Sequence, residues 1–527
     1  MTTTTLPDTA AVPPGAPEPD DLPEVDPPPP AIVSLDLRSL ALFRMVFGFV
    51  ILLDLLARIP EIPVFYTDSG AVPREFMFST IRSWGGYSLQ FMSGAWPVQL
   101  AFFLVMVAVI SCFIVGYRTR TSAVLAWLLI MSMQGRNPYI LHGGDDVIRI
   151  LMFWCIFAPL NARWSIDAAL NRDKPLLPVS NASWGAQALM FQLCFIYLST
   201  AVWKVHPVWL TEGSAIYYAL HLTQFAKPFG TWLAQFPHLL QLMTWATWGL
   251  EFFGPFLLFI PVRTGWFRLL AMVSFMGLHL GIFLTMAIGL FPWICMAAWI
   301  MVMPSMVWDW VDRWYPRLSP SVRAFIERTR AGVAATLVPF FARFKTPPAP
   351  RENLGLAGGV FVGAYALIVF AINFQTLPVV KGKVPGLMAF AEALLGLHQK
   401  WAMFAPYPMP KDGWYQVVGT QPGGRKLDIW NGGIPPTMAQ PDVIKSYRDV
   451  RWNKYLNAVT FDEFAFLRPY FGSYLCRSWN ASHTGPSRVD HISINYIMRI
   501  NPKPGQPFPP RSTDVLYQQN CPRQPLQ

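Results

Sequence analysis

Long apolar stretches alternate with short polar loops over most of the first 375 residues. Nine of them are long enough, or nearly so, to cross a hydrocarbon layer of about 30 Å. They cover residues 38–57, 97–116, 121–135, 147–160, 185–204, 240–261, 267–288, 289–307 and 356–374. This pattern predicts an α-helical polytopic (multi-pass) membrane protein with about nine transmembrane helices.

The lysine and arginine residues of the loops predict the orientation. If the N-terminus is cytoplasmic, the inner loops carry 15 of these residues and the outer loops carry five. Inner loops of membrane proteins are enriched in positive charge. We therefore expect a protein of the inner cell membrane, with its N-terminus in the cytoplasm and the region after residue 375 outside.

Composition divides the chain further. Residues 1–32 are rich in proline and acidic residues and are predicted to be disordered. Eight of the apolar stretches fall within 33–308, a basic cytoplasmic loop covers 309–355, and the ninth stretch follows at 356–374. Residues 375–527 contain short alternating runs, at 414–418 and 491–497, between Gly- and Pro-rich turns, which predicts an external β-rich domain.

The cysteines bear on possible disulfides and metal sites, and the net charge bears on partners other than the lipid bilayer. Cys476 and Cys521 are the cysteines of the external domain, where they could pair or remain two free thiols. No spacing typical of a metal site is present, so no metal is predicted. The net charge of +11 is not arranged as a basic stripe with interleaved aromatic residues, so no nucleic-acid partner is expected.

Lys204 ends the apolar run that begins at Phe191, and His206 follows two residues later. A lysine at this place can extend its ammonium group to the aqueous boundary and act as a positional anchor. Alternatively, partial removal from water leaves some of the amine as a free base, which suits proton abstraction. The local pattern favours the anchor, so the surroundings of Lys204 must decide.

Further polar residues gather at the predicted outer face. The loop after the third stretch, the outer half of the seventh and the middle of the sixth all contribute, and ionisable residues at membrane depth point to function. We expect a pocket there. Its catalytic candidates are Lys204, His279 and Asn137, and its supporting candidates are His142, His206, Asp145 and Glu251.

These residues also have structural interpretations. The segment 143–146 is typical of a turn and a helix N-cap, in which Asp145 would pair with Arg149 four residues on. A single histidine in an apolar helix, such as His279, is more often a hydrogen-bonded structural residue. Glu251 can likewise accept hydrogen bonds from a neighbouring helix.

Short strings occur along the chain in a fixed order. They are Asp36–Arg44, Phe65–Gly70, Arg136–Pro138, Ala162–Asp167, Tyr197–Gly213, Glu251–Pro255, His279–Trp293 and Gln399–Pro406. Together they resemble the horizontally transferred transmembrane (HTTM) domain family, the bacterial relatives of vitamin K-dependent γ-glutamyl carboxylase. The resemblance covers nearly the whole chain beyond the first 30 residues.

The resemblance implies roles for particular residues. In the carboxylase, a lysine that corresponds to Lys204 is the proposed base that deprotonates reduced vitamin K. The hydroquinone then reacts with oxygen, and the strong base that results removes a γ-hydrogen from glutamate before carbon dioxide adds. Asn137 and His279 correspond to a family asparagine and histidine. The carboxylase histidine that follows the asparagine is replaced here by Pro138, which has no imidazole.

The resemblance favours a γ-carboxylase-like membrane protein. It would be a quinol-dependent oxygenase or carboxylase that uses reduced vitamin K or menaquinol and acts on a peptide or lipid-soluble substrate at the outer membrane face. The alternative is a non-enzymatic scaffold, or a maturation or export factor, whose external domain binds a secreted polypeptide. Transport ranks third, because the chain has no paired broken helices and no inverted repeat.

Overall fold

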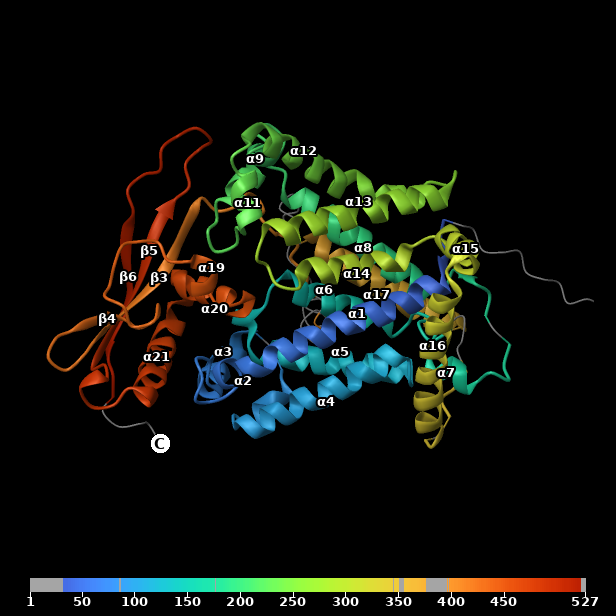
Figure 1. The fold of residues 1–527 in the computed structure, drawn as a ribbon, viewed down its shortest axis with the longest axis horizontal. Coiled ribbons are helices and arrows are strands. Elements are labelled where there is room, and N and C mark those ends of the chain that lie inside the picture. Colours follow the sequence, from blue (N-terminus) through green and yellow to red (C-terminus); the bar gives the residue numbers. More distant parts are fainter. Residues whose placement is uncertain are drawn as a thin grey trace, which may run out of the picture.

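The computed structural model describes residues 32–84, 87–175, 177–344, 346–349, 355–375, 396 and 398–522. The predicted disordered tail lies outside the described residues except for residue 32, and so do residues 376–395 of the predicted external domain. Figure 1 shows a helical bundle at one end of the molecule and a four-stranded sheet at the other. We call α1–α14 with α17 the membrane domain, and residues 398–522 the C-terminal domain.

The membrane domain is built on nine principal helices. They are α1 (Leu37–Arg58), α4 (Trp96–Val115), α5 (Thr119–Arg136), α6 (Gly143–Cys155), α8 (Trp184–Trp203), α12 (Pro237–Phe253), α13 (Thr264–Thr285), α14 (Phe291–Trp299) and α17 (Gly355–Gln375). Helix α1 begins at the N-cap Asp36, whose carboxylate accepts a hydrogen bond from the backbone N–H of Arg38 at 2.8 Å. Helix α4 ends at Gly116, whose φ of 72° favours glycine.

Shorter elements connect these helices. They are α2 (Ile62–Phe65), α3 (Arg74–Trp84), α7 (Ile166–Leu170), α9 (Pro207–Leu210), α10 (Ala215–Leu220), α11 (Pro228–Leu233), and the paired strands β1 (Leu35–Asp36) and β2 (Ser180–Asn181). The predicted basic loop is largely helical, because it forms α15 (Ser305–Trp314) and α16 (Pro320–Ala342). Sequence reasoning missed both helices.

Each of the nine predicted stretches contains a helix, but the helices differ in length. Of the described helices, four are long and apolar enough to cross a membrane: Leu37–Phe65, Trp96–Val115, Trp184–Trp203 and Thr264–Thr285. A fifth span results if the pair Phe291–Val302 and Ser305–Arg317, bent by 88°, counts as one. Helix α6 has 13 residues, and its length of about 20 Å is too short to cross alone. The count of nine spans and its orientation therefore stay predictions.

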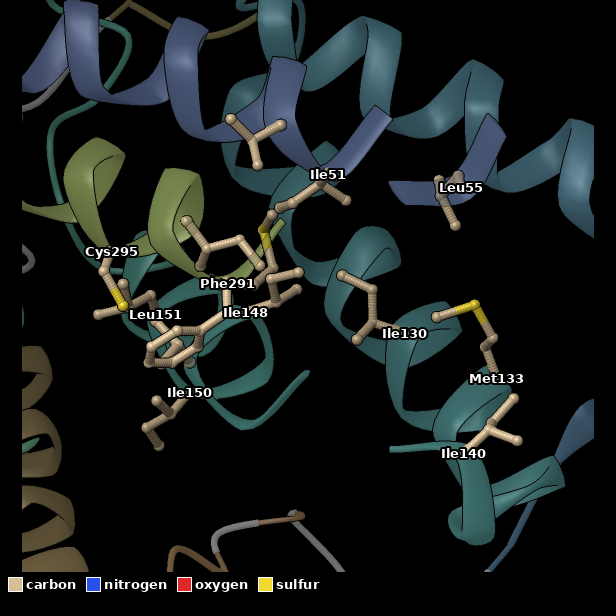
Figure 2. Close-up of a cluster of buried hydrophobic side chains, with 14 of the residues drawn as sticks. Ile51, Leu55, Ile130, Met133, Ile140, Ile148, Ile150, Leu151, Phe291 and Cys295 are labelled. Carbon is tan, nitrogen blue, oxygen red and sulfur yellow. The ribbon is translucent and has the colours of Figure 1, made fainter. Parts of the chain in front are cut away.

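The core of the membrane domain forms where α1, α5, α6 and α14 meet. Figure 2 shows Ile51 and Leu55 of α1 near Ile130 and Met133 of α5, with residues of α6 and α14 beside them. Helix α8 packs against α6, α12 and α17. This arrangement brings the end of α8 and the middle of α12 together.

The C-terminal domain contains an antiparallel sheet of order β4-β3-β5-β6. Its strands are β3 (Lys411–Thr420), β4 (Lys426–Asp428), β5 (His491–Ile500) and β6 (Ser512–Asn520). Both predicted runs are confirmed as strands, and Tyr415 pairs with Tyr496 across β3 and β5. A disulfide joins Cys476 in α21 to Cys521 after β6.

The prediction of a β-rich domain was incomplete. Helices α19 (Val443–Ser446), α20 (Val450–Thr460) and α21 (Arg468–Ser482) lie between β4 and β5. In Figure 1, α20 and α21 lie between the sheet and the bundle. Trp452, Tyr455, Leu456 and Val459 are buried on α20. The C-terminal domain is therefore a mixed domain, and its helices contact the membrane domain.

Candidate functional site

A cavity of about 550 Å³ lies between the membrane domain and the C-terminal domain. Helices α8, α12, α13 and α14 contribute one part of its wall, and residues 400–411 with α20 contribute the other. Aromatic residues, including Phe225, Phe291 and Phe404, make much of this wall apolar. The carboxylate, imidazole and amine side chains in the wall are those of His142, Asp146, Lys204, Glu251, His279, Lys400, Lys411 and Lys454.

Lys204 and Glu251 form an ion pair in the cavity wall. Lys204 is the C-cap of α8, and its Nζ lies 2.6 and 2.7 Å from the two carboxylate oxygens of Glu251 in α12. The two residues are 4% and 6% exposed. Nζ also lies 4.5 Å from the centre of the Trp209 ring, which adds a cation–π contact. A buried amine with a carboxylate partner is not a freely snorkelling anchor, and its role as a base stays a prediction.

His279 forms a second polar group beside this pair. Its Nε2 lies 2.7 Å from the hydroxyl of Tyr197, which also accepts a hydrogen bond from the indole N–H of Trp299 at 2.9 Å. His279 lines the cavity, and no hydrogen-bond partner of its Nδ1 is found among the described residues. Whichever nitrogen carries the proton, Nδ1 keeps a donor or an acceptor that the described residues do not use.

The cavity has a basic side toward the C-terminal domain. Lys400, Lys411 and Lys454 belong to its wall, and in the described part of the chain none of them forms an ion pair. Lys400 lies over the ring of Trp203, with its Nζ 5.5 Å from the ring centre. Burial lowers the pKa of Lys454. Lys400 and Lys411 therefore supply most of the positive charge by which this side can attract an anionic group.

Asp145 belongs to a different site, a closed ring of four buried charges. Its two carboxylate oxygens bind Arg58 of α1 at 2.5 Å and Arg451 of α20. Asp54 binds the same two arginines, at 2.8 and 2.7 Å. We call these four residues the ion ring. Burial alone would raise the pKa of Asp145, but the adjacent arginine guanidinium groups lower it.

His142 connects the ion ring to the cavity. It is the N-cap of α6. Its ring Nδ1 accepts a hydrogen bond from the backbone N–H of Gly144 at 2.9 Å, and its backbone N–H donates to the carboxylate of Asp145 at 2.8 Å. The predicted turn and N-cap at 143–146 are thus present. The predicted pair of Asp145 with Arg149 was wrong, because Arg149 reaches back only three residues to Asp146, at 2.6 Å. Burial lowers the pKa of His142 to about 3.

Asn137 and His206 do not line the cavity. The Asn137 amide donates to the carbonyl of Phe65 at 3.1 Å, and its carbonyl accepts from Tyr139 N–H. His206 is the N-cap of α9, and its ring lies 4.6 Å from the ring of Tyr407, a cavity residue. The structure thus brings Lys204, Glu251, His279 and His142 together in one wall and leaves Asn137 in a loop-stabilising position.

Several residues of the site escaped sequence reasoning. Tyr197, Trp209 and Trp299 are aromatic residues in aromatic-rich segments, so nothing in the sequence distinguishes them from ordinary core residues. Arg451 lies 306 residues from Asp145. No group of three or more His, Cys, Asp or Glu residues that could hold a metal ion is found in the described part of the chain.

Comparison with known proteins identifies the family. The sequence model of the HTTM domain matches residues 33–310, more than half of the chain. The chain therefore belongs to the HTTM domain family, as its motifs predicted. Together with the apolar helices, this makes it a membrane protein.

A curated relative is more distant. The sporulation-delaying protein SdpB of Bacillus subtilis (strain 168) is 23% identical over 201 residues. The match covers 36% of this chain and 57% of the relative, so the chain spans little more than half of that protein's length. No solved structure matches.

Proposed function

We propose that this protein is a membrane enzyme of the carboxylase-like type, in which Lys204 accepts a proton from a quinol bound in the cavity. The observation that carries the proposal is the buried contact of Lys204 with both oxygens of Glu251 in the wall of a largely apolar cavity. The volume of the cavity lies within the range of about 300–1,000 Å³ that is common for small-molecule sites. Reduced vitamin K or menaquinol would supply an oxidisable hydroquinone there.

Glu251 explains how an amine could become a base in this place. The ammonium of Lys204 can pass a proton to the carboxylate with which it is hydrogen-bonded, which leaves a neutral amine and a neutral acid. The amine can then accept a proton from a quinol hydroxyl, because its lone pair is free. Arginine could not replace it, since a guanidinium stays charged.

Other residues of the wall would orient the ligand. A ligand that displaces the atoms covering Nδ1 of His279 would gain a hydrogen bond there, while Nε2 stays bonded to Tyr197. Phe225, Phe291 and Phe404 would hold an apolar ring system and keep water away. We place the C-terminal domain outside the inner cell membrane, so that a peptide or lipid-soluble substrate would reach the cavity from the outer face.

The test is quinol epoxidation by the purified full-length protein in detergent. Reduced vitamin K or menaquinol is supplied in air, with and without a glutamate-containing peptide and labelled bicarbonate. We expect Lys204→Ala to reduce epoxide formation by about 10²- to 10⁴-fold, the usual contribution of a general base. The matched control is Lys445→Ala, which removes an exposed lysine of α19. Equal turnover by Lys204→Ala and wild type would contradict the proposal.

The products distinguish the possible reactions. Epoxide together with labelled carboxylated peptide would identify a carboxylase, and epoxide alone would identify an oxygenase that lacks the second step. The latter outcome would agree with Pro138 at the place of the carboxylase histidine.

One observation favours a maturation or export factor as the second candidate. A cleft of about 700 Å³ lies between α10–α12 of the membrane domain and residues 440–444 and 504–505 of the C-terminal domain, and its wall is mixed polar and apolar. Such a cleft could hold an extended segment of a secreted polypeptide. In that case Lys204→Ala and His279→Ala would leave the function intact, whereas changes in the cleft would abolish it.

A further inference from the structure

Helices α15 and α16 form an exposed surface at the end of the bundle remote from the C-terminal domain. Figure 1 shows α1 and α4 running along the bundle, whereas α16 runs across its end. The 23-residue helix α16 has no buried residue. A helix of this length needs a partner for its apolar residues.

Five of the exposed apolar residues of α16 lie on one side. At 3.6 residues per turn, Val322, Phe325, Ile326, Val333 and Phe340 fall within an arc of about 100°. Phe325 is 70% exposed, Val333 53% and Phe340 50%. The protein thus leaves a largely apolar stripe uncovered, in which Thr329 and Thr336 are the polar members.

The other side of α16 attaches the helix to the bundle. Phe341 packs against Tyr117 in the turn between α4 and α5, with the ring centres 4.3 Å apart. Tyr315, just before α16, donates a hydrogen bond to Glu327 at 3.1 Å. The contact of Phe341 holds the helix against the bundle end, and the hydrogen bond of Tyr315 ties α16 to the segment that precedes it, so the apolar stripe has a defined direction.

Positive charge borders the stripe. Arg328 and Arg330 fall on opposite sides of the apolar arc, and Arg343 follows the last turn; all three are exposed. Residues 305–344 contain six arginines and three carboxylates. The carboxylates are engaged within the protein: Asp309 and Asp312 lie 3.9 and 3.4 Å from Arg38, and Glu327 accepts from Tyr315. Because six arginines face three carboxylates, the net charge of the surface is positive.

Helix α15 adds tryptophans at the same end. Trp310 and Trp314 are both exposed, and Arg317 lies over the ring of Trp314 at 4.8 Å. Tryptophan and arginine together are typical of the membrane–water interface, where the ring sits at the level of the headgroups.

We infer that the surface formed by α15 and α16 lies in the headgroup layer of the membrane and binds anionic phospholipid. The apolar stripe enters the boundary of the acyl chains, and Arg328, Arg330 and Arg343 contact phosphate groups. An amphipathic helix that lies across transmembrane helices, with an apolar stripe between basic flanks, has the geometry of an interfacial helix. Juxtamembrane arginines are attracted to anionic leaflets.

The test uses the full-length protein in a neutral detergent, titrated with phosphatidylglycerol or with phosphatidylcholine. Hydrogen–deuterium exchange of residues 320–342 reports binding. We expect phosphatidylglycerol to slow exchange there and phosphatidylcholine to do so only at much higher concentration. The variant Arg328→Gln/Arg330→Gln/Arg343→Gln should shift the phosphatidylglycerol midpoint by about 100-fold, at about fivefold for each arginine.

Two further variants define the outcome. Arg425→Gln/Lys426→Gln removes exposed charges from the end of the β3–β4 turn and the first residue of β4, and it should leave the midpoint unchanged. Phe325→Ser/Val333→Ser should lose protection in both lipids, because the apolar stripe is broken. Equal midpoints for the two lipids, or an equal shift with the control variant, would overturn the inference.

Discussion

The protein contains two buried charge sites that are built in opposite ways. In the ion ring, each of Asp54, Arg58, Asp145 and Arg451 binds two of the others, so every member is satisfied from within the protein. In the cavity, Lys204 has one carboxylate partner, and both residues line an open space. A closed site of this kind serves to hold structural elements together, whereas an open site has room for a substrate.

The elements that carry the two sites support this distinction. The ion ring joins α1, the start of α6 and α20, and thus fixes the C-terminal domain to the membrane domain. The pair of Lys204 and Glu251 joins α8 and α12 within the membrane domain only. Loss of the ion ring should therefore weaken the attachment of the C-terminal domain to the membrane domain. Loss of the pair of Lys204 and Glu251 should chiefly lower the rate of the proposed reaction.

The largest effect is expected from Arg451→Ala. This change leaves Asp54 and Asp145 buried beside a single arginine, and breaking a buried ion pair typically costs about 3–5 kcal/mol of unfolding free energy. Limited proteolysis of the full-length protein should show faster release of the C-terminal domain, and the denaturation midpoint should fall. The control is Arg425→Ala, at an exposed position in the β3–β4 turn. Unchanged protease resistance of Arg451→Ala would show that the ring does not hold the domains together.

A smaller effect on stability and a larger one on activity are expected at the open site. Lys204→Met leaves Glu251 without its partner and should cost about 3 kcal/mol, less than the upper end of the range for the ring because the cavity can admit water. The double variant Lys204→Met/Glu251→Met should regain most of this stability, because an apolar pair replaces a buried ion pair.

The double-mutant cycle should be measured twice, by denaturation and by quinol epoxidation. We expect stability to return in the double variant and activity to stay lost. If activity returned together with stability, the pair would be a structural contact like the ion ring.

The sequence predicted which residues converge better than how they pair. Lys204, Glu251 and His279 were placed near one another because ionisable residues in apolar stretches are few and the order of the stretches limits where they lie. Their partners depend on the rotation of each helix and on aromatic residues such as Tyr197 and Trp209. Asp145 was paired with the wrong arginine, since Arg451 becomes its neighbour only when the C-terminal domain docks.

The fold was predictable where the spacing of the apolar residues along the chain was regular. Apolar stretches marked nine helices, but hydropathy does not separate a spanning helix such as α4 from the short α6. In the C-terminal domain, residues 452, 455, 456 and 459 repeat at helical spacing. That signal could have revealed α20, but the glycine and proline content favoured strands and turns.

The smallest effect is expected at His142, which touches both sites. Burial lowers its pKa to about 3, from about 6.5 in the unfolded chain. As the pH falls below about 6.5, the unfolded chain therefore binds a proton that the folded protein does not, and stability is lost with acidification. At about 1.4 kcal/mol for each pH unit, this loss reaches about 2 kcal/mol near pH 5. Asp145 does not change this window, because its pKa is lowered and it stays charged.

His142→Asn should remove this pH dependence. Asparagine keeps an acceptor for the N–H groups at the start of α6, so the helix retains an N-cap. Unfolding free energies at pH 7 and pH 5 should differ by about 2 kcal/mol less in the variant than in wild type, and His238→Asn, at an exposed position of α12, should behave as wild type does. An equal acid loss in His142→Asn would mean that the ring of His142 takes up a proton in the folded protein. The wall between the ion ring and the cavity would then be open to water, and the distinction between a closed and an open site would fail there.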